Sequence, residues 1–481
     1  MFKLAPLSAA IVLALAGQAM ADSSTSTQSQ TGDQNIAEVQ QKASPGSTVA
    51  QSQTGLGNNH LAVQDLSSSQ IQQSVNGEYN AGYAEQLAEE GSTVNQVARG
   101  ALNDTYASQS LGFSNQAQQA QDGTGNYSFV YQDSQTRSQA TTQQTGQQNR
   151  AYVEQLLSGG DNRALSVQTG TDNYSAAEHI SHQGGQIEIY QDGDGNWAYG
   201  DQRDGQGGTI GIDQKGIGNS VEVWQDTQSN SRTTVTQTGE VNEGVIDQSF
   251  GTNNTAVLLQ IGERNATWSD QFESSHSVTS ITQDGRDNLH YTYQNGDNHT
   301  LSVSTLGDSN KIQASNWKGD KAGGQFGNGQ RAEINQNGTG NSVNLTQDGA
   351  QQLARLDQKG SGNVMETNQA ESNNELYFEQ NGTDNLLIAA QRGYDNYAYG
   401  STAGDSNTIK LDQSGSGNQS HTWQLYGTGN DVNIKQTDGV NVAYVTQGGN
   451  YNQALVDQSG ANMSATISQY GNSNQATVLQ Q

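Results

Sequence analysis

An eleven-residue pattern recurs through almost the whole of this chain: Gln, any residue, Gly, two residues, Asn, five residues, and then Gln again. If Gln, Gly and Asn each made up roughly an eighth of a random chain, about 0.1 matches would arise by chance. So strict a repeat limits the chain to folds that are built from stacked copies. The fifteen full matches begin at Gln30, Gln53, Gln121, Gln144, Gln191, Gln214, Gln237, Gln260, Gln283, Gln336, Gln358, Gln380, Gln413, Gln447 and Gln469.

The composition argues against an ordinary globular domain. Only 31% of the residues are hydrophobic, and the chain of 481 residues contains seven Phe and five Trp, too few large apolar side chains for a conventional core. Low hydrophobicity and a net charge of −28 are typical of disordered chains, but a disordered chain has no reason to keep a strict period. The acidity, with Lys and Arg scattered along the chain, argues against partners such as nucleic acid or anionic lipid.

Residues 1–21 have the features of a secretory signal peptide. Lys3 supplies a positive start, residues 11–16 form the centre of an apolar stretch, and Ala19-Met20-Ala21 fits a cleavage site. The apolar stretch is too short for a membrane-spanning helix. We expect residues 22–29 to form a short Ser/Thr-rich N-terminal segment and residues 30–481 to form one repeat domain. The sequence contains no Cys, so no disulfide can stabilise the secreted fold.

The residues that follow each Asn alternate as in a β-strand. In the copy that begins at Gln336, the side chains of Asn341, Val343, Leu345 and Gln347 fall on one face, because successive side chains of a strand point to opposite faces. Charged and aromatic residues occupy the intervening positions of other copies. We therefore expect Asn, Gln and the small or branched residues between them to face the interior.

The Gly-containing segment between strands has the composition of a turn, since Gly and Asn tolerate positive φ. One strand and one turn take up eleven residues, so two such halves close a rung of 22 or 23 residues. The predicted fold is all-β: an amyloid-like parallel β-solenoid with two strands per rung and about 20 rungs, on the order of 95 Å long at ~4.8 Å per rung. The turn glycines assigned in this way are Gly193, Gly216, Gly239, Gly262, Gly285, Gly338, Gly360 and Gly382.

Stacked rungs place Gln above Gln and Asn above Asn. Each amide can donate to one neighbour and accept from the other, which offsets the cost of burying a polar side chain. Pro would interrupt such a ladder, and the mature sequence contains only Pro45. The residues assigned to this structural amide ladder are Gln191, Asn196, Gln202, Gln214, Asn219, Gln225, Gln237, Asn242, Gln248, Gln260, Asn265, Gln271, Gln283, Asn288, Gln294, Gln336, Asn341, Gln347, Gln358, Asn363, Gln369, Gln380, Asn385, Gln391, Gln447, Asn452, Gln458, Gln469, Asn474 and Gln480.

The repeat weakens in two places. Within residues 65–120 the spacing drifts, and residues 83–90 have a helix-like composition that we expect the neighbouring rungs to override. Residues 316–325 are rich in Gly and Lys, and we expect them to form a loop that bulges from the solenoid. Neither irregularity has the composition of a domain linker.

The repeat resembles the curlin repeat, Gln-x-Gly-x-Gly-Asn-x-Ala-x-x-x-Gln. This pattern is nearly complete from Gln191 to Gln202, and the copies that begin at Gln121 and Gln214 are close variants. The chain is therefore similar to the curlin-repeat family, the subunits of bacterial curli fibres, over almost the whole of its mature length.

The resemblance implies a secreted subunit of an extracellular functional amyloid. Such subunits cross the outer membrane unfolded and polymerise at the cell surface, and their fibres serve biofilm matrix, adhesion and cell–cell contact. The partners that the resemblance implies are further copies of the chain itself, a nucleator curlin and the outer-membrane curli secretion channel. This chain is longer than family subunits typically are. Its residues 22–29 replace the Gly- and Asn-rich secretion tag of many family members, which leaves the export route open.

The two ends of the solenoid suggest how it would assemble. A terminal rung presents unpaired backbone groups that can recruit another strand, and no capping helix or Pro follows the last rung at Gln480. Head-to-tail contacts that do not close then give a filament. Turn residues such as Asp192 and Asp348 are candidate gatekeepers that delay assembly.

No catalytic arrangement is evident, and nothing in the sequence indicates a cofactor or a small-molecule substrate. His179 lies close to His182 in sequence but occupies a Gln position, so we interpret it as a tolerated ladder residue rather than as a metal ligand. Asp192 and Asp194 fit a calcium-binding nonapeptide repeat poorly, because that repeat has a period of nine residues and here the period is eleven.

Outward aromatic residues have two interpretations. They can stack across strands on a solvated face, or they can serve lateral bundling and adhesion. We favour stacking. The sets concerned are Tyr127, Phe129 and Tyr131, then Trp197 and Tyr199, and finally Tyr291 and Tyr293.

Three other functions are compatible with parts of the pattern. The chain could be a minor or nucleator curlin rather than the bulk subunit, given its length and imperfect rungs. It could be a monomeric β-solenoid that binds a surface such as ice or polysaccharide, which would need a flat array of one residue type that is not evident here. An enzyme of the parallel β-helix type would need three-strand coils and acids clustered in a groove.

Overall fold

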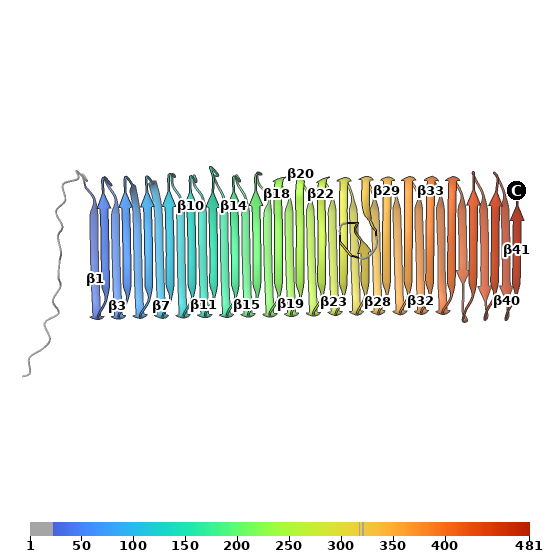
Figure 1. Ribbon diagram of the computed structural model, residues 1–481, viewed down its shortest axis with the longest axis horizontal. Coiled ribbons are helices and arrows are strands. Elements are labelled where there is room, and N and C mark those ends of the chain that lie inside the picture. Colours follow the sequence, from blue (N-terminus) through green and yellow to red (C-terminus); the bar gives the residue numbers. More distant parts are fainter. Residues whose placement is uncertain (1–22, 317, 320–321) are drawn as a thin grey trace, which may run out of the picture.

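The computed structural model describes residues 23–316, 318–319 and 322–481. The signal-peptide prediction for residues 1–21 and the loop residues Trp317, Asp320 and Lys321 lie outside this described part of the chain. All secondary structure within it is β-strand, arranged as two long sheets that face each other (Figure 1). We call one strand from each sheet, taken together, a level.

The first sheet begins with β1 and contains 20 strands. Their bounds are β1 (Thr25–Asp33), β3 (Thr48–Leu56), β5 (Ser68–Glu78), β7 (Glu90–Ala101), β9 (Gln116–Thr124), β11 (Gln139–Gln147), β13 (Arg163–Thr171), β15 (Gln186–Asp194), β17 (Thr209–Ile217), β19 (Arg232–Glu240), β21 (Thr255–Glu263), β23 (Val278–Arg286), β25 (Thr300–Asp308), β28 (Arg331–Thr339), β30 (Leu353–Ser361), β32 (Glu375–Thr383), β34 (Tyr397–Asp405), β36 (Gln419–Gln424), β38 (Val442–Gly448) and β40 (Ser464–Tyr470).

The second sheet begins with β2 and runs alongside. Its strands are β2 (Ile36–Lys42), β4 (Asn59–Asp65), β6 (Ala81–Leu87), β8 (Asp104–Ser110), β10 (Tyr127–Asp133), β12 (Arg150–Leu156), β14 (Tyr174–Ile180), β16 (Trp197–Arg203), β18 (Ser220–Ser229), β20 (Glu243–Thr252), β22 (Ala266–Ser275), β24 (Leu289–Asp297), β26 (Lys311–Ala314), β27 (Gly324–Asn328), β29 (Ser342–Ala350), β31 (Val364–Ser372), β33 (Leu386–Tyr394), β35 (Thr408–Ser416), β37 (Asp431–Thr437), β39 (Gln453–Ser459) and β41 (Gln475–Gln480).

The predicted two-strand solenoid is confirmed. Every strand pairs in parallel with the strand two further along the chain, or with the next one across the β26–β27 interruption, and each repeat position stacks on its counterpart, as Gln214 does on Gln237. Paired residues are 22 or 23 positions apart in sequence, with two exceptions. The spacing is 24 from β11 to β13 and from β12 to β14, and it is 31 for the pairs that span the insertion after β26, such as Thr300 with Arg331. Residues 83–90, with their helix-like composition, contribute to strands β6 and β7, because pairing on both sides outweighs local propensity.

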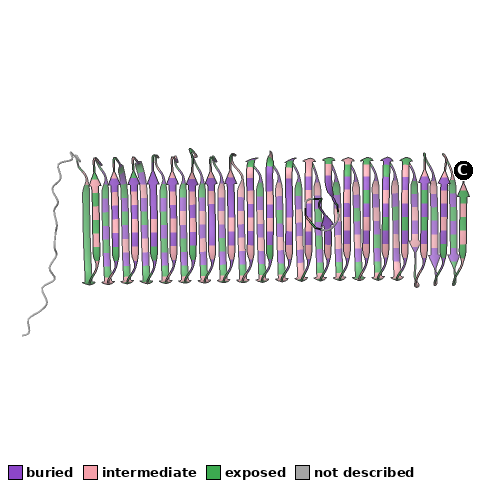
Figure 2. Cartoon of the chain, in the orientation of Figure 1, coloured by how far each residue is buried: buried purple, intermediate pink, exposed green. Residues whose placement is uncertain are grey.

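Burial alternates along each strand, so one face of each sheet lines a shared interior (Figure 2). The interior holds small or branched apolar side chains, such as Ile212, Val223 and Leu345, together with Gln and Asn. A core this narrow needs few large aromatic side chains, which explains how a chain with 31% hydrophobic residues can fold. Both ends differ from the middle: β1 is exposed along its whole length, and β41 alternates between exposed and intermediate.

The second sheet is interrupted once. Residues 315–323 separate β26 from β27, and these two short segments pair with opposite halves of β24 on one side and of β29 on the other. The insertion therefore leaves the register of both neighbouring levels intact (Figure 1). Within the described part of the chain, no helix is long and apolar enough to span a membrane.

Candidate functional site

A column of stacked Gln side chains runs along the interior of the first sheet. Gln214 is fully buried, and its Nε2 donates to Gln237 Oε1 on the next level at 2.9 Å. The second Nε2 proton goes across the interior to the backbone carbonyl of Trp197, also at 2.9 Å. Each Gln therefore links two neighbouring levels and also links the two sheets. These bonds satisfy both Nε2 protons of a side chain that is buried away from water.

The second sheet carries an equivalent Gln column. Gln225 donates to Gln248 Oε1 at 2.8 Å and Gln248 to Gln271 Oε1 at 2.7 Å. The column extends from Gln41 to Gln480 with Gln at every level except one, where His179 lies between Gln155 and Gln202. This places His179 at the position that the sequence pattern assigns to Gln.

An Asn column at the corner between the two strands of each level completes the set. Asn219 Nδ2 donates to Asn196 Oδ1 on the previous level and to the carbonyl of Gly239 on the next, both at 3.0 Å. The backbone N–H of Asn219 also donates to Asn196 Oδ1, at 3.1 Å. The bonds repeat at every level from Asn35 to Asn474. In the bonds between side-chain amides, Asn donates toward the N-terminal end and Gln donates toward the C-terminal end. The solenoid therefore has a direction, and its two ends differ chemically.

The structure places the thirty assigned ladder residues in these three columns. The first-sheet column contains Gln191, Gln214, Gln237, Gln260, Gln283, Gln336, Gln358, Gln380, Gln447 and Gln469. The second-sheet column contains Gln202, Gln225, Gln248, Gln271, Gln294, Gln347, Gln369, Gln391, Gln458 and Gln480. The Asn column contains Asn196, Asn219, Asn242, Asn265, Asn288, Asn341, Asn363, Asn385, Asn452 and Asn474.

The assigned glycines also stack on one another, at the end of each first-sheet strand. At Gly216 φ is +118°, and a Cβ added there would lie 2.0 Å from the carbonyl oxygen of Gly239. Glycine is therefore needed at this position for two reasons: the positive φ, and the carbonyl oxygen of the next level, which leaves no room for a Cβ. The same approach recurs at Gly193, Gly239, Gly262, Gly285, Gly338, Gly360 and Gly382.

A comparison with family models bears directly on these columns. The model of the curlin associated repeat matches residues 186–226, 229–262, 382–415 and 404–437. Each matched segment covers ladder Gln, turn Gly and corner Asn in the stacked positions described above. The chain contains curlin associated repeats. No curated protein sequence matches it significantly.

This curlin-repeat protein has a further Gln column that the sequence pattern did not indicate. It lies in the first sheet, two residues before the main column, where Gln73 donates to Gln96 Oε1 at 2.7 Å. It occupies the first five levels, including those where Val75 and Ala98 interrupt the main column. The spacing drift within residues 65–120 is therefore a change of column. The sequence signal that could have revealed it is Gln-x-Gln, as in Gln51 and Gln53.

Breaks in the interior columns are repacked by neighbouring side chains. Where Thr305 replaces Gln, His290 reaches from the opposite sheet and its Nε2 lies 3.0 Å from Thr305 Oγ1. Where Gly400 replaces a larger residue, Phe378 of the level before fills the space, and a Cβ at Gly400 would lie 2.5 Å from the Phe ring. Such pairs are separated by a level in sequence, so they cannot be recognised from a single repeat.

The corner that leads from the second sheet back to the first also pairs large residues with glycines. A Cβ at Gly112 would lie 2.7 Å from Glu89 Oε1, and one at Gly159 would lie 2.8 Å from Gln135 Oε1. The side chains of Glu89 and Gln135 are buried, and burial raises the pKa of Glu89 to about 7. On the outer face, burial and, to a smaller extent, the charge of Asp247 on the neighbouring level together raise the pKa of Asp270 to about 7.

His179 interrupts the second-sheet column at a fully buried position. Burial lowers the pKa of its imidazole to about 3 from the ordinary 6.5, and the nearby His182 ring contributes to the lowering. Gln155 keeps the cross-interior bond to the carbonyl of Gln139, at 3.1 Å, but has no ladder amide on the next level to which it can donate. His179 is thus a neutral substitute in the column at ordinary pH.

We expect His179→Gln to stabilise the fold and to make it less sensitive to acid. The new amide can accept from Gln155 and donate to Gln202, which should raise the free energy of unfolding by about 1 kcal/mol at pH 7. A buried His whose pKa is lowered destabilises the fold as pH falls from 6.5 toward 3, by up to about 1.4 kcal/mol per pH unit. Urea unfolding at pH 7 and pH 4.5 measures both effects, and an equal loss in the variant and the parent would contradict this role.

Outward aromatic residues stack on their neighbours along the sheet. Tyr106 lies between Tyr83 and Phe129 with ring centroids 5.0 and 4.9 Å apart and ring planes within 16°. Tyr174 and Trp197 are stacked in the same way, 5.9 Å apart. The ring faces therefore cover one another, as expected for cross-strand stacking.

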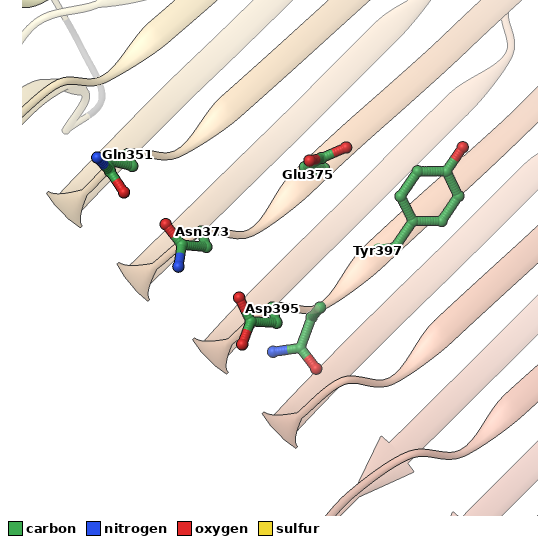
Figure 3. A pocket seen from close by; sticks show the side chains of 6 residues that line it. Gln351, Asn373, Glu375, Asp395 and Tyr397 are labelled. Carbon is green, nitrogen blue, oxygen red and sulfur yellow. The ribbon is translucent and has the colours of Figure 1, made fainter.

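A surface hollow of about 390 Å³ lies on the outside of the corner where the chain returns from the second sheet to the first, next to the ends of β29, β31 and β33. Gln351, Asn373 and Asp395 form a row along it, one residue per level (Figure 3). Glu375 and Tyr397 line its other side. Across the described residues, no group of three or more His, Asp or Glu side chains is arranged to hold a metal ion.

Proposed function

We propose that this curlin-repeat protein is a secreted structural subunit that assembles head-to-tail into extracellular, curli-like amyloid fibres. Such fibres would serve biofilm matrix and adhesion, with a nucleator curlin and an outer-membrane curli secretion channel as partners. The proposal draws on the family for location and partners. The observation that carries self-assembly is the chemical complementarity of the two end faces.

The two end faces offer opposite halves of each ladder bond. Within the described residues, Gln30 and Gln41 donate to the next level but receive no ladder bond, so their Oε1 atoms face the N-terminal end. At the other end, Gln480 Nε2 donates only to the carbonyl of Ser464, and Asn474 Oδ1 receives no donor from the described chain. Gln480 of one copy can donate to Gln41 of the next, and Asn474 can accept from Asn35.

The backbone is complementary in the same way. The N–H of Gln453 donates to the carbonyl of Asn474 on the next level at 2.8 Å. The equivalent N–H of Gln475, at the start of β41, has no backbone acceptor among the described residues. Two N-terminal faces would bring Gln Oε1 acceptors together, and two C-terminal faces would bring Gln Nε2 donors together. Contacts between unlike ends repeat without closing, and a polar filament grows.

The test blocks one end and leaves the internal backbone bonds in place. The exposed bond from Gln475 Nε2 to Gln453 Oε1, at 3.2 Å, is lost equally in the variant and in its control. Gln475→Pro deletes the open N–H at the first residue of an edge strand, where Pro is tolerated, and Gln475→Ala is the matched control. The purified mature chain and Q475A should form fibres that bind thioflavin and diffract at about 4.8 and 10 Å. Q475P should fold with the same circular dichroism but elongate at least tenfold more slowly from parent seeds. A parent chain that stays monomeric for days, or a Q475P chain that elongates normally, would refute the proposal.

A further inference from the structure

One interior column changes its chemistry along the solenoid. It lies in the first sheet, two residues before the main Gln column. From the N-terminal to the C-terminal end its members are Gln28, Gln51, Gln73, Gln96, Gln119, Thr142, Ser166, Ile189, Ile212, Val235, Leu258, Ile281, Val303, Ile334, Leu356, Phe378, Gly400, Thr422, Val445 and Ile467. The N-terminal end face therefore shows an amide where the C-terminal end face shows an aliphatic side chain.

Inside the chain, hydroxyl groups separate the amide levels from the aliphatic ones. Gln119 Nε2, at the end of the amide stack, donates to Ser128 Oγ at 2.7 Å, and this hydroxyl lies 2.6 Å from Thr142 Oγ1. Ser166 on the following level pairs with Ser175 at 2.6 Å. The column thus changes from Gln to Ile through two levels, those of Thr142 and Ser166, whose hydroxyl groups can both donate and accept hydrogen bonds.

A Gln that directly follows an apolar level lacks a donor. In the main column Gln121 follows Ala98, and its buried Oε1 atom has no hydrogen-bond partner. By contrast, Gln424 follows Thr402 and receives a bond from Thr402 Oγ1 at 3.2 Å. An unpartnered buried acceptor costs more than its bond would contribute.

The joint between two copies would create such a position. Stacking β40 and β41 of one copy on β1 and β2 of the next continues the main columns, with Gln469 on Gln30 and Gln480 on Gln41. The same register places Ile467 below Gln28. In the free chain β1 is exposed and water can bind Gln28 Oε1, whereas in the joint this atom is buried without a donor.

We infer that the N-terminal end face prefers a partner strand with Gln at both interior positions, Gln-x-Gln, over the chain's own Ile-x-Gln. The occupant is a parallel β-rung of another polypeptide, whose first Gln donates to Gln28 while its second donates to Gln30. The joint between identical copies then lacks the ladder bond that Gln28 would accept. This inference rests on the proposed head-to-tail assembly and adds the partner that one end selects.

The test uses full-length chains that differ at Ile467 only. Seeds of Ile467→Gln present Gln-x-Gln, and seeds of Ile467→Thr supply a hydroxyl donor, as Thr402 does for Gln424. Ile467→Val has the shape of Thr without the donor and is the matched control. At concentrations too low for fibre growth, the first parent monomer should bind the ends of I467Q and I467T seeds with a roughly fivefold lower dissociation constant than the ends of I467V seeds, the contribution of about one hydrogen bond. I467T also covers the case in which I467Q folds poorly beside Val445.

The donor must act through Gln28. Monomer carrying Gln28→Val should show no difference between I467T and I467V seeds, because the acceptor is gone. Equal binding of the first parent monomer to all three kinds of seed would overturn the inference while leaving the assembly itself intact. Failure of the parent chain to form seeds would instead overturn the proposed function, so the two failures are distinguishable.

Discussion

Gly216→Ala is expected to lower the free energy of unfolding by about 4 kcal/mol or more. The added Cβ would lie 2.0 Å from the carbonyl oxygen of Gly239, and φ at this residue is +118°, which L-residues rarely adopt. Relief requires the backbone of two levels to move apart, which weakens their hydrogen bonds. Urea unfolding followed by circular dichroism measures the loss.

The same strand supplies the control. Gly211 lies on the outer face of β17, and a Cβ added there would meet no atom within 4 Å. Gly211→Ala should therefore change stability by less than about 1 kcal/mol, in either direction. Similar losses for both variants would show that backbone freedom in general, and not the stacked carbonyl, makes glycine necessary at position 216.

Asn341→Ala is expected to cost about 4 kcal/mol. The Asn341 Oδ1 atom accepts bonds from the backbone N–H and the Nδ2 of Asn363, at 3.2 and 3.0 Å. Its own Nδ2 donates to the carbonyl of Gly360 at 3.1 Å. Removing the amide leaves several buried groups unpartnered, each worth about 1–3 kcal/mol.

Asn337→Ala is the matched control, because Asn337 is exposed on β28 and belongs to no ladder. It should change the unfolding free energy by less than about 0.5 kcal/mol. Hydrogen exchange adds a local measurement: with Asn341→Ala, exchange should speed up most at the levels of Asn310 and Asn363. An unaltered exchange pattern there would argue that the Asn column contributes little to joining levels.

The sequence is sufficient to predict the two-strand solenoid because one physical rule fixes it. A strand with Asn341 and Gln347 on the same face as Val343 and Leu345 can bury those amides only by stacking identical neighbours. The period then sets the length of each level. Local irregularities do not alter the outcome, since neighbouring levels on both sides hold a segment such as β6 in register.

The features that escaped prediction depend on contacts between levels. The extra column at Gln73 and Gln96 shares the repeat's composition but not its phase, so a search for one pattern overlooks it. The pairing of Phe378 with Gly400 joins residues a level apart and follows no motif. The second role of the glycines is of the same kind, because the carbonyl that excludes a Cβ at Gly216 belongs to the next level.

In-register stacking of successive levels is the claim on which the rest depends, and spin labels test it most directly. The chain has no Cys, so paired labels can be placed at Asp213→Cys with Thr236→Cys, two outward residues stacked on neighbouring levels. At about 4.8 Å this pair should show strong spin exchange, whereas Asp213→Cys with Thr234→Cys, roughly 8 Å apart, should show much weaker coupling. Stronger exchange in the offset pair, or none in either, would contradict the stacked-ladder structure.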